Sequence, residues 1–195
     1  MKVMNFNDFI EVANNTEDQL SLVIKCHFEL DSILDKLLTL SMYDASSLEV
    51  RRISFILKVD MLIGLGILSK NVRPLFNNIN SIRNIYAHNP YSIFDKEMAN
   101  KTKTIIMQVE DFKTFVRDDD VEKHILVLAF TIAYVCLEKS LKDQYRAIQS
   151  NEILNEKIKK ALSCSRIVNN HESRQLHDKK VNDELKKKYP DLFDE

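Results

Sequence analysis

The sequence is poor in the residues that bound short strands and form turns. Its 195 residues include two glycines and three prolines. Scarcity of these residues argues against a sheet of many strands and favours long helices. Hydrophobic residues make up 45% of the chain and charged residues 29%. This composition is typical of a soluble globular protein that is long enough to bury a core.

Motifs for metals, disulfides and cofactors are also lacking. The three cysteines, Cys26, Cys136 and Cys164, are odd in number and lack zinc-site spacing, which argues against a disulfide framework and predicts no metal site. Cys26 and Cys136 lie in apolar stretches, so we expect buried free thiols. Gly64 and Gly66 are interpreted as a helix terminator, because no strand precedes them and no Gly-Lys-Ser/Thr follows. No cofactor is therefore predicted.

Long hydrophobic runs are absent as well. The longest, from Ile125 to Leu137, is interrupted only by Thr131 and is shorter than the roughly 20 residues of a membrane-spanning helix. It predicts a helix buried in the core or in a dimer. The first residues, MKVMNFNDF, lack the apolar segment of a secretory signal. We expect a cytoplasmic protein with no membrane segment.

The net charge of −1 argues against a generally nucleic-acid-binding protein, but the charges are unevenly distributed. Residues 51–103 hold nine Lys and Arg against three acids. This segment predicts either a phosphate-binding surface or a basic region balanced by packing against acidic helices, since charge segregation along a chain need not persist in space. The candidate RNA-binding residues in it are Arg51, Arg52, Lys58, Lys70 and Arg73.

Capping signals divide the first third of the chain into helices. Residues 5–13 are expected to form at most a short amphipathic helix. Thr16–Gln19 has the pattern of a capping box that opens a helix through about Leu40, and Ser46–Glu49 has the pattern of a second one, opening a helix through about Leu62.

The later segments also favour helices. Residues 96–115 are compatible with one helix or two, although 105–107 could equally be extended. Asp118–Asp120 would cap a long helix through about Ala147. We therefore predict an all-α, up-and-down bundle of four or five helices over residues 1–150, followed by a charged helical extension over 151–195.

Residues 69–88 carry the most informative pattern. Their apolar positions have the spacing of one buried helical face: Leu75, Ile79, Ile82 and Tyr86. Polar side chains follow the same spacing on another face: Asn77, Asn80, Ser81, Asn84 and His88. Pro90 disfavours the α conformation at Asn89, so the helix is predicted to end at about His88.

Arg83, Asn84 and His88 are the candidate catalytic residues. Residues four apart on a helix lie on the same side, so Asn84 and His88 are neighbours, and the long side chain of Arg83 can reach them. Histidine suits general acid–base catalysis near neutral pH, and arginine binds phosphate through its fork of donors. Without a carboxylate or a cysteine, this combination indicates phosphodiester chemistry that needs no metal.

The run Arg83–His88, Arg-Asn-Ile-Tyr-Ala-His, resembles the Arg-x4-His motif of the HEPN superfamily. Its context resembles the branch that contains the mannitol operon repressor, with Leu65–Leu68 before the motif and Phe94–Asp95 after it. The resemblance covers about residues 16–145 and is specific over 51–95.

This resemblance implies a metal-independent endoribonuclease, often a toxin or a phage-defence or stress-response effector. His88 would move the proton at the nucleophile or the leaving oxygen, Arg83 would stabilise the phosphorane, and Asn84 would orient the phosphate or the imidazole. Because each chain supplies one such histidine, a two-fold homodimer with facing motifs is implied. Glu29 is a candidate supporting acid, and an antitoxin or regulatory protein is a candidate partner.

Other interpretations stay open. A non-catalytic regulatory or binding module of the mannitol-repressor type, or a structural helical protein with a polar interface seam, would carry the same motif. His88 could be a helix-end histidine bonded to a carbonyl, Arg83 a surface salt bridge, Glu29 a solvated charge beside Lys25, and His27 a packed histidine. Catalysis requires Arg83 and His88 to be reachable from solvent, whereas an interface seam buries them.

Overall fold

The computed structural model describes residues 3–42, 48–117, 121–164 and 183. These residues form helices and no strand, which confirms the predicted all-α class. The α-helices are α1 (Phe6–Asn15), α2 (Gln19–Ser41), α3 (Phe55–Gly64), α4 (Arg73–His88), α5 (Lys96–Gln108) and α6 (Glu122–Cys164). Short 3-10 helices are η1 (Val50–Arg52), η2 (Lys70–Val72) and η3 (Glu110–Phe115).

The chain divides into two compact units, Met1–Leu141 and Lys142–Glu195. The division falls inside α6, whereas the sequence placed it after residue 150, further along the same helix. In the second unit the described part of α6 exposes Leu154 and Ile158. The rest of the predicted extension, apart from residue 183, lies outside the described residues.

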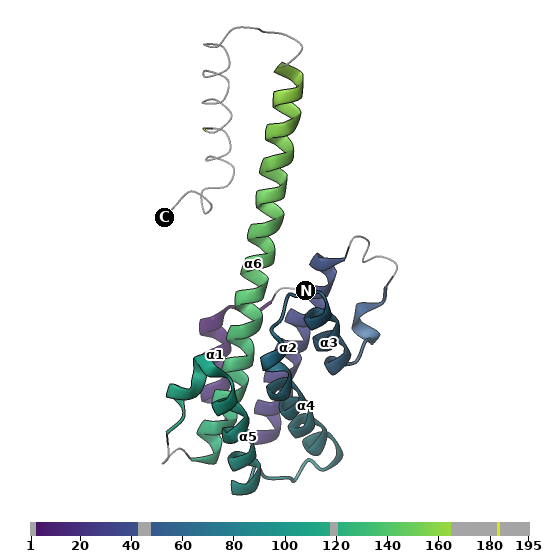
Figure 1. Ribbon diagram of the computed structural model, residues 1–195. Helices are drawn as coiled ribbons and strands as arrows, with labels where there is room; N and C mark the ends of the chain where they lie inside the picture. The colour runs from purple at the N-terminus through teal and green to yellow at the C-terminus, as the bar shows by residue number, and fades with distance from the viewer. Residues whose placement is uncertain (1–2, 43–47, 118–120, 165–182, 184–195) are drawn as a thin grey trace. The chain divides into compact units, whose positions relative to one another are not determined.

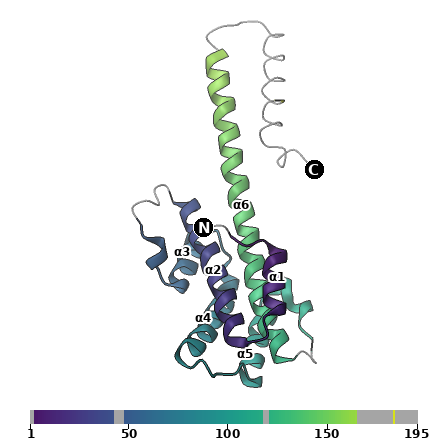
Figure 2. The same cartoon turned by 180° about the vertical axis from the view of Figure 1, so that it is seen from behind.

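The core of the first unit is built around α2, which packs against α1, α3 and α4 (Figures 1 and 2). Its buried positions recur at helical spacing, among them Leu22, Cys26, Ile33 and Leu37. Helix α4 packs in turn against α3 and α5. The candidate motif helix is therefore held on several sides by neighbouring helices.

The first predicted capping box is wrong. Helix α2 begins at Gln19, and the Asp18 carboxylate accepts a hydrogen bond from the Ser21 backbone N–H at 2.8 Å. Thr16 instead follows the end of α1, where its hydroxyl donates to the Val12 carbonyl at 2.7 Å. In the second predicted box, Ser46 lies outside the described residues. The Glu49 carboxylate pairs with the Arg52 side chain, and α3 starts at Phe55, later than this box predicted.

The structure defines residues 96–115, for which the sequence was compatible with one helix, two helices or an extended segment. Helix α5 covers Lys96–Gln108, so the extended alternative for residues 105–107 is excluded. The Asp95 carboxylate caps it, accepting from the Met98 N–H at 2.9 Å. Gly66 has a φ of 72° in the turn after α3, which is the left-handed conformation that glycine adopts readily. It acts as the predicted helix terminator. The proposed Asp118–Asp120 cap lies outside the described residues.

Helix α6 extends well beyond the apolar run that predicted it. Within it, Ile125, Leu126, Phe130 and Leu137 are buried in the core of the first unit. The stretch from Glu122 to Lys160 is long and apolar enough to cross a membrane, and half of its most apolar window is buried in the protein. This is weak evidence for a membrane span, because core helices have the same length and composition.

The cysteines are free thiols where the structure describes them. Cys26 is buried and Cys136 is half-buried. Burial raises the pKa of Cys26 to about 12, so its thiol stays protonated and unreactive at neutral pH. The Cys164 side chain lies outside the described residues.

Candidate functional site

Helix α4 has the two faces that its sequence predicts. Leu75, Ile79, Ile82 and Tyr86 are at most 2% exposed. The helix begins at Arg73, with Pro74 in its first turn, after η2. It ends at His88, because Asn89 adopts an extended conformation before Pro90. The predicted end is confirmed, and the predicted start at residue 69 is a few residues too early.

The polar face of α4 is open to solvent in the chain. Ser81, Asn84 and His88 are exposed, and Asn80 and Arg83 are partly exposed. Arg83 donates a hydrogen bond from Nη1 to the Asn84 Oδ1 at 3.3 Å. The candidate catalytic side chains can therefore be reached by a ligand, so the stripe is not a seam buried within one chain.

Arg83 differs from Arg52, Arg73 and Arg146 in the charge of its neighbours. Arg52, Arg73 and Arg146 each form an ion pair with an acid. Within the described part of the chain, no carboxylate pairs with Arg83, whose polar contact is the uncharged Asn84 amide. The salt-bridge interpretation of Arg83 is therefore not supported, and its guanidinium retains its capacity to bind an anion.

Gln19 fixes the end of the motif helix. Its Oε1 accepts hydrogen bonds from the Tyr86 hydroxyl at 2.8 Å and from the Phe94 N–H at 3.0 Å. The Phe94 side chain is buried, and Asp95 caps α5. The Phe-Asp pair thus has a structural role, returning the chain from His88 to the core. From the sequence, Gln19 was expected only to complete a capping box, since nothing local links it to Tyr86 and Phe94 so far along the chain.

His27 lies beside the candidate site. Its ring packs against the Phe55 ring with centroids 4.2 Å apart and planes tilted by 33°, and its Nε2 is buried without a hydrogen-bond partner in the described chain. Burial lowers the pKa of His27 to about 4, the positive charges of Arg83 and Lys58 lower it too, and hydrogen bonding with Asn80 opposes the shift. The prediction of a packed histidine is confirmed, but its proximity to Arg83 was not foreseen.

The lowered pKa makes protein stability depend on His27. An unfolded chain protonates this histidine near 6.5 and the folded chain near 4. Between these values the unfolded state binds more protons, so the free energy of unfolding should fall as the pH drops from about 6.5 to about 4, by on the order of 3 kcal/mol. Denaturant unfolding at several pH values measures the free energy of unfolding. In His27→Gln, the decrease of this free energy between about pH 6.5 and pH 4 that is due to His27 should be absent. An NMR titration giving His27 an ordinary pKa would contradict it.

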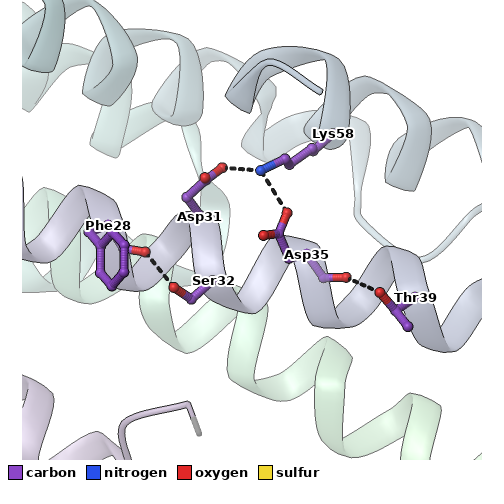
Figure 3. A network of polar contacts seen from close by, with 6 residues as sticks. All are labelled: Phe28, Asp31, Ser32, Asp35, Thr39 and Lys58. Carbon is purple, nitrogen blue, oxygen red and sulfur yellow. Dashed lines mark hydrogen bonds and ion pairs between the residues drawn. The ribbon is translucent and has the colours of Figure 1, made fainter. Parts of the chain in front are cut away.

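Lys58 is not an RNA-binding residue. Its side chain is fully buried, with Nζ 2.7 Å from both Asp31 Oδ1 and Asp35 Oδ1 (Figure 3). Both acids lie one turn apart on α2 and face Lys58 of α3. A buried charge requires such partners because its desolvation is costly. The prediction failed because a basic residue was assumed to be at the surface.

The other candidate RNA-binding residues differ in availability. Arg73 binds Asp60 through two hydrogen bonds of 2.6 and 3.0 Å, which lower the pKa of that carboxyl. Arg52 pairs with Glu49. Arg51 and Lys70 are exposed. The predicted basic surface is therefore reduced, since three of its five residues are paired with acids.

Glu29 does not join the candidate site. It is 7% exposed, and its Oε1 accepts a hydrogen bond from the Met4 N–H. Its charge acts on Tyr134 of α6, on the opposite side of α2 from His27, since residues two apart on a helix point about 200° apart. Both interpretations of Glu29, as a supporting acid and as a solvated charge, are wrong. Its carboxylate holds the N-terminal segment instead.

A separate half-open cleft of about 500 Å³ lies beside α2. Its lining residues are Ser32, Asp35, Lys36, Thr39, Leu48, Glu49, Val50 and Arg51. Its charges are of mixed sign, which defines no ligand class. Among the side chains that the structure describes, no three His, Cys, Asp or Glu gather where they could hold a metal ion.

Together these observations define an all-α protein with a solvent-facing Arg-Asn-His group at the end of one helix. Comparison with protein-family models, curated proteins and solved structures finds no match for the chain. The resemblance to the HEPN superfamily therefore rests on the motif and its context, and the HEPN assignment stays a prediction.

Proposed function

We propose that the protein is a metal-independent endoribonuclease of HEPN type, with Arg83, Asn84 and His88 as its catalytic residues. The observation that carries the proposal is the state of Arg83, a partly exposed guanidinium with no acid partner in the described chain. It lies on the same helix end as the exposed Asn84 and His88. A cation without an acid partner, at the same helix end as a histidine, suits a phosphodiester.

The reaction follows from these groups. The RNA 2′-hydroxyl loses its proton to a base and attacks the adjacent phosphorus, forming the 2′-O–P bond. The P–O5′ bond breaks, and the leaving 5′-oxygen takes a proton from an acid. His88 serves as the base or the acid, Arg83 stabilises negative charge on the phosphorane, and Asn84 orients the phosphate or the imidazole. The products carry a 2′,3′-cyclic phosphate and a 5′-hydroxyl.

The two proton transfers require one acid and one base. In a two-fold homodimer, each chain would supply one of them through its His88. Exposed apolar side chains on α2 support this homodimer, because Ile24 is 40% and Phe28 60% exposed and residues four apart lie on the same side of a helix. Exposed apolar side chains of this size favour a partner. Sedimentation should give twice the chain mass of 22.8 kDa. The proposal includes cytoplasmic action as a toxin or phage-defence effector, with an antitoxin as partner.

Two arginines of α4 provide a matched test of the anion site. Arg83→Gln should weaken binding of a labelled RNA by about tenfold, because a charge-assisted contact is lost. The slope of the logarithm of the binding constant against the logarithm of the salt concentration should become shallower by about one. Arg73→Gln should leave affinity nearly unchanged, because Asp60 already neutralises Arg73. Equal losses in both variants would contradict the assignment. Fluorescence anisotropy at several salt concentrations measures both quantities.

The second candidate function is a non-catalytic regulatory or binding module. The loop after His88 favours it, because Tyr91 is 93% and Ile93 71% exposed. Such side chains suit contacts with a protein or with unstacked bases. Under this alternative the chain binds RNA or a partner protein through Arg83 without cleaving it.

A further inference from the structure

Tyr91 is the most exposed of the large apolar side chains that the structure describes. It is 93% exposed, and Ile93, two residues later, is 71% exposed. Tyrosine rings usually contribute their area to packing, as Tyr86 and Tyr134 do in the core of this chain. Two large apolar side chains exposed so close together indicate a surface that contacts another molecule.

The loop that carries Tyr91 is anchored on both sides of it. The Asn89 side chain accepts a hydrogen bond from the Tyr91 N–H at 3.2 Å, and the Asn89 carbonyl accepts one from the Ser92 N–H at 3.0 Å. After Tyr91, the Phe94 N–H donates to the Gln19 Oε1 at 3.0 Å, and the Phe94 ring is buried. The backbone is therefore held while the Tyr91 ring stays in solvent, so a ligand meets a ring that is already presented.

Tyr91 and Ile93 lie on the same side of this loop. Exposure alternates along residues 91–94, since Tyr91 and Ile93 are exposed, Ser92 is partly buried and Phe94 is buried. This alternation is typical of an extended segment, in which every second side chain lies on the same face. Because Phe94 is in the core, the face of Tyr91 and Ile93 is turned to solvent. These two residues are called the Tyr91 platform below.

The Tyr91 platform is close to the candidate catalytic residues. Three peptide units separate Tyr91 from His88, so their Cα atoms are at most about 11 Å apart. The hydrogen bond between Ser92 and Asn89 has the spacing of a β-turn, with Pro90 and Tyr91 as its central residues. The turn therefore presents the ring directly after the end of the motif helix. A base attached beside a phosphate at this helix end can reach it.

The sequence around the Tyr91 platform contains no acid that would repel an RNA strand. Residues 61–94 include no Asp or Glu, and Arg83 and His88 lie in this range. Asp95, which follows, is held as the cap of α5. A strand with a phosphate at Arg83 therefore meets no carboxylate from residues 61–94. Aromatic rings bind unpaired bases by stacking, so an RNA base is the contact that these charges favour.

We propose that the Tyr91 platform stacks the base next to the phosphate that Arg83 binds. Bases in a duplex are stacked on their neighbours and paired, so the substrate must be unpaired at this position to reach the ring. Tyr91 is then a specificity-determining residue that selects loops and single strands, whereas Arg83 binds the phosphate of any sequence. This inference rests on the proposed phosphate site at Arg83 and adds base recognition to it.

Two labelled probes separate base stacking from phosphate binding. Both are used in a His88→Ala background, which prevents cleavage. One probe is a short oligoadenylate, and the other is an abasic ribose phosphate of the same length, which keeps the phosphates and lacks the bases. Tyr91→Ala should weaken binding of the oligoadenylate by about tenfold, because a stacking contact is lost, and should change binding of the abasic probe by less than about twofold. Fluorescence anisotropy measures both affinities.

Two variants control for loss of structure and for exposure alone. Tyr91→Phe keeps the ring and should bind both probes as the parent does. Phe115→Ala is the matched control, because Phe115 is also an exposed aromatic residue but lies on η3. It should leave both affinities unchanged. An oligoadenylate loss in Phe115→Ala as large as that in Tyr91→Ala would overturn the assignment of the ring.

The remaining outcomes distinguish this inference from the proposed function. Arg83→Gln should weaken binding of both probes alike, because both carry phosphates. If it weakens neither, the proposed phosphate site is absent and the inference fails with it. If Arg83→Gln weakens both while Tyr91→Ala weakens both equally or neither, the phosphate site stands and base stacking is overturned. Conversion of a dimer to a monomer by Tyr91→Ala, with no difference between the probes, would assign the ring to a protein contact instead.

Discussion

Replacing His88 with alanine is expected to lower the rate of RNA cleavage by about 10²- to 10⁴-fold, the usual contribution of a general acid or base. His88 is exposed at the end of α4, and its backbone position is set by the helix stop at Asn89. Its side chain is exposed in the part of the chain that the structure describes, so alanine should leave the packing there unchanged. The fold should therefore survive while proton transfer is lost. Single-turnover cleavage of a labelled RNA measures the rate.

His124→Ala is the matched control, because His124 is also an exposed histidine but lies on α6. It should retain parental cleavage. Melting temperatures of both variants should stay near that of the parent. A His88→Ala protein that still cleaves at the parental rate would remove His88 from the mechanism.

Replacing Lys58 with methionine is expected to lower the free energy of unfolding by about 3 kcal/mol. The ammonium group is fully buried between two carboxylates, and methionine keeps the aliphatic stem but leaves both acids without their cation. The side chains of Asp31 and Asp35 are 34% and 23% exposed, so water screens part of the repulsion between the two carboxylates. The expected loss of stability is therefore at the low end of the range for a broken buried ion pair. Urea unfolding at neutral pH measures it.

Two further variants test whether the loss of the buried ion pairs causes the lower stability of Lys58→Met. Arg52→Met breaks the exposed pair with Glu49 and should change stability little, because solvent screens such pairs. Combining Lys58→Met with Asp31→Asn and Asp35→Asn should restore part of the lost stability, because uncompensated charge is removed. If Lys58→Met is no more destabilising than Arg52→Met, the buried network does not stabilise the fold.

The parts of the fold that were predictable depend on local signals. The end of α4 follows from Pro90, and its buried face follows from the spacing of Leu75, Ile79, Ile82 and Tyr86. Scarce glycine and proline pointed to the all-α class. The first capping box failed because the carboxylate of Asp18, and not the hydroxyl of Thr16, caps α2.

The features that escaped prediction depend on contacts between distant segments. The spacing of Phe55, Val59 and Leu62 does place Lys58 on the buried face of α3, a signal overlooked when its charge was interpreted as surface charge. The contacts of Gln19 with Tyr86 and Phe94, and the electrostatic effect of Arg83 on His27, have no local signature. They arise only when α2 packs against α4.

Analysis of RNA cleavage products in the presence of EDTA tests the central claim most directly. The folded wild-type chain should cleave a labelled RNA pool in the chelator and leave 2′,3′-cyclic phosphate and 5′-hydroxyl ends, because His88 and Arg83 supply the proton transfer and the charge stabilisation. Absence of cleavage by a folded, dimeric wild type, or products with other ends, would contradict the ribonuclease assignment and favour the binding module.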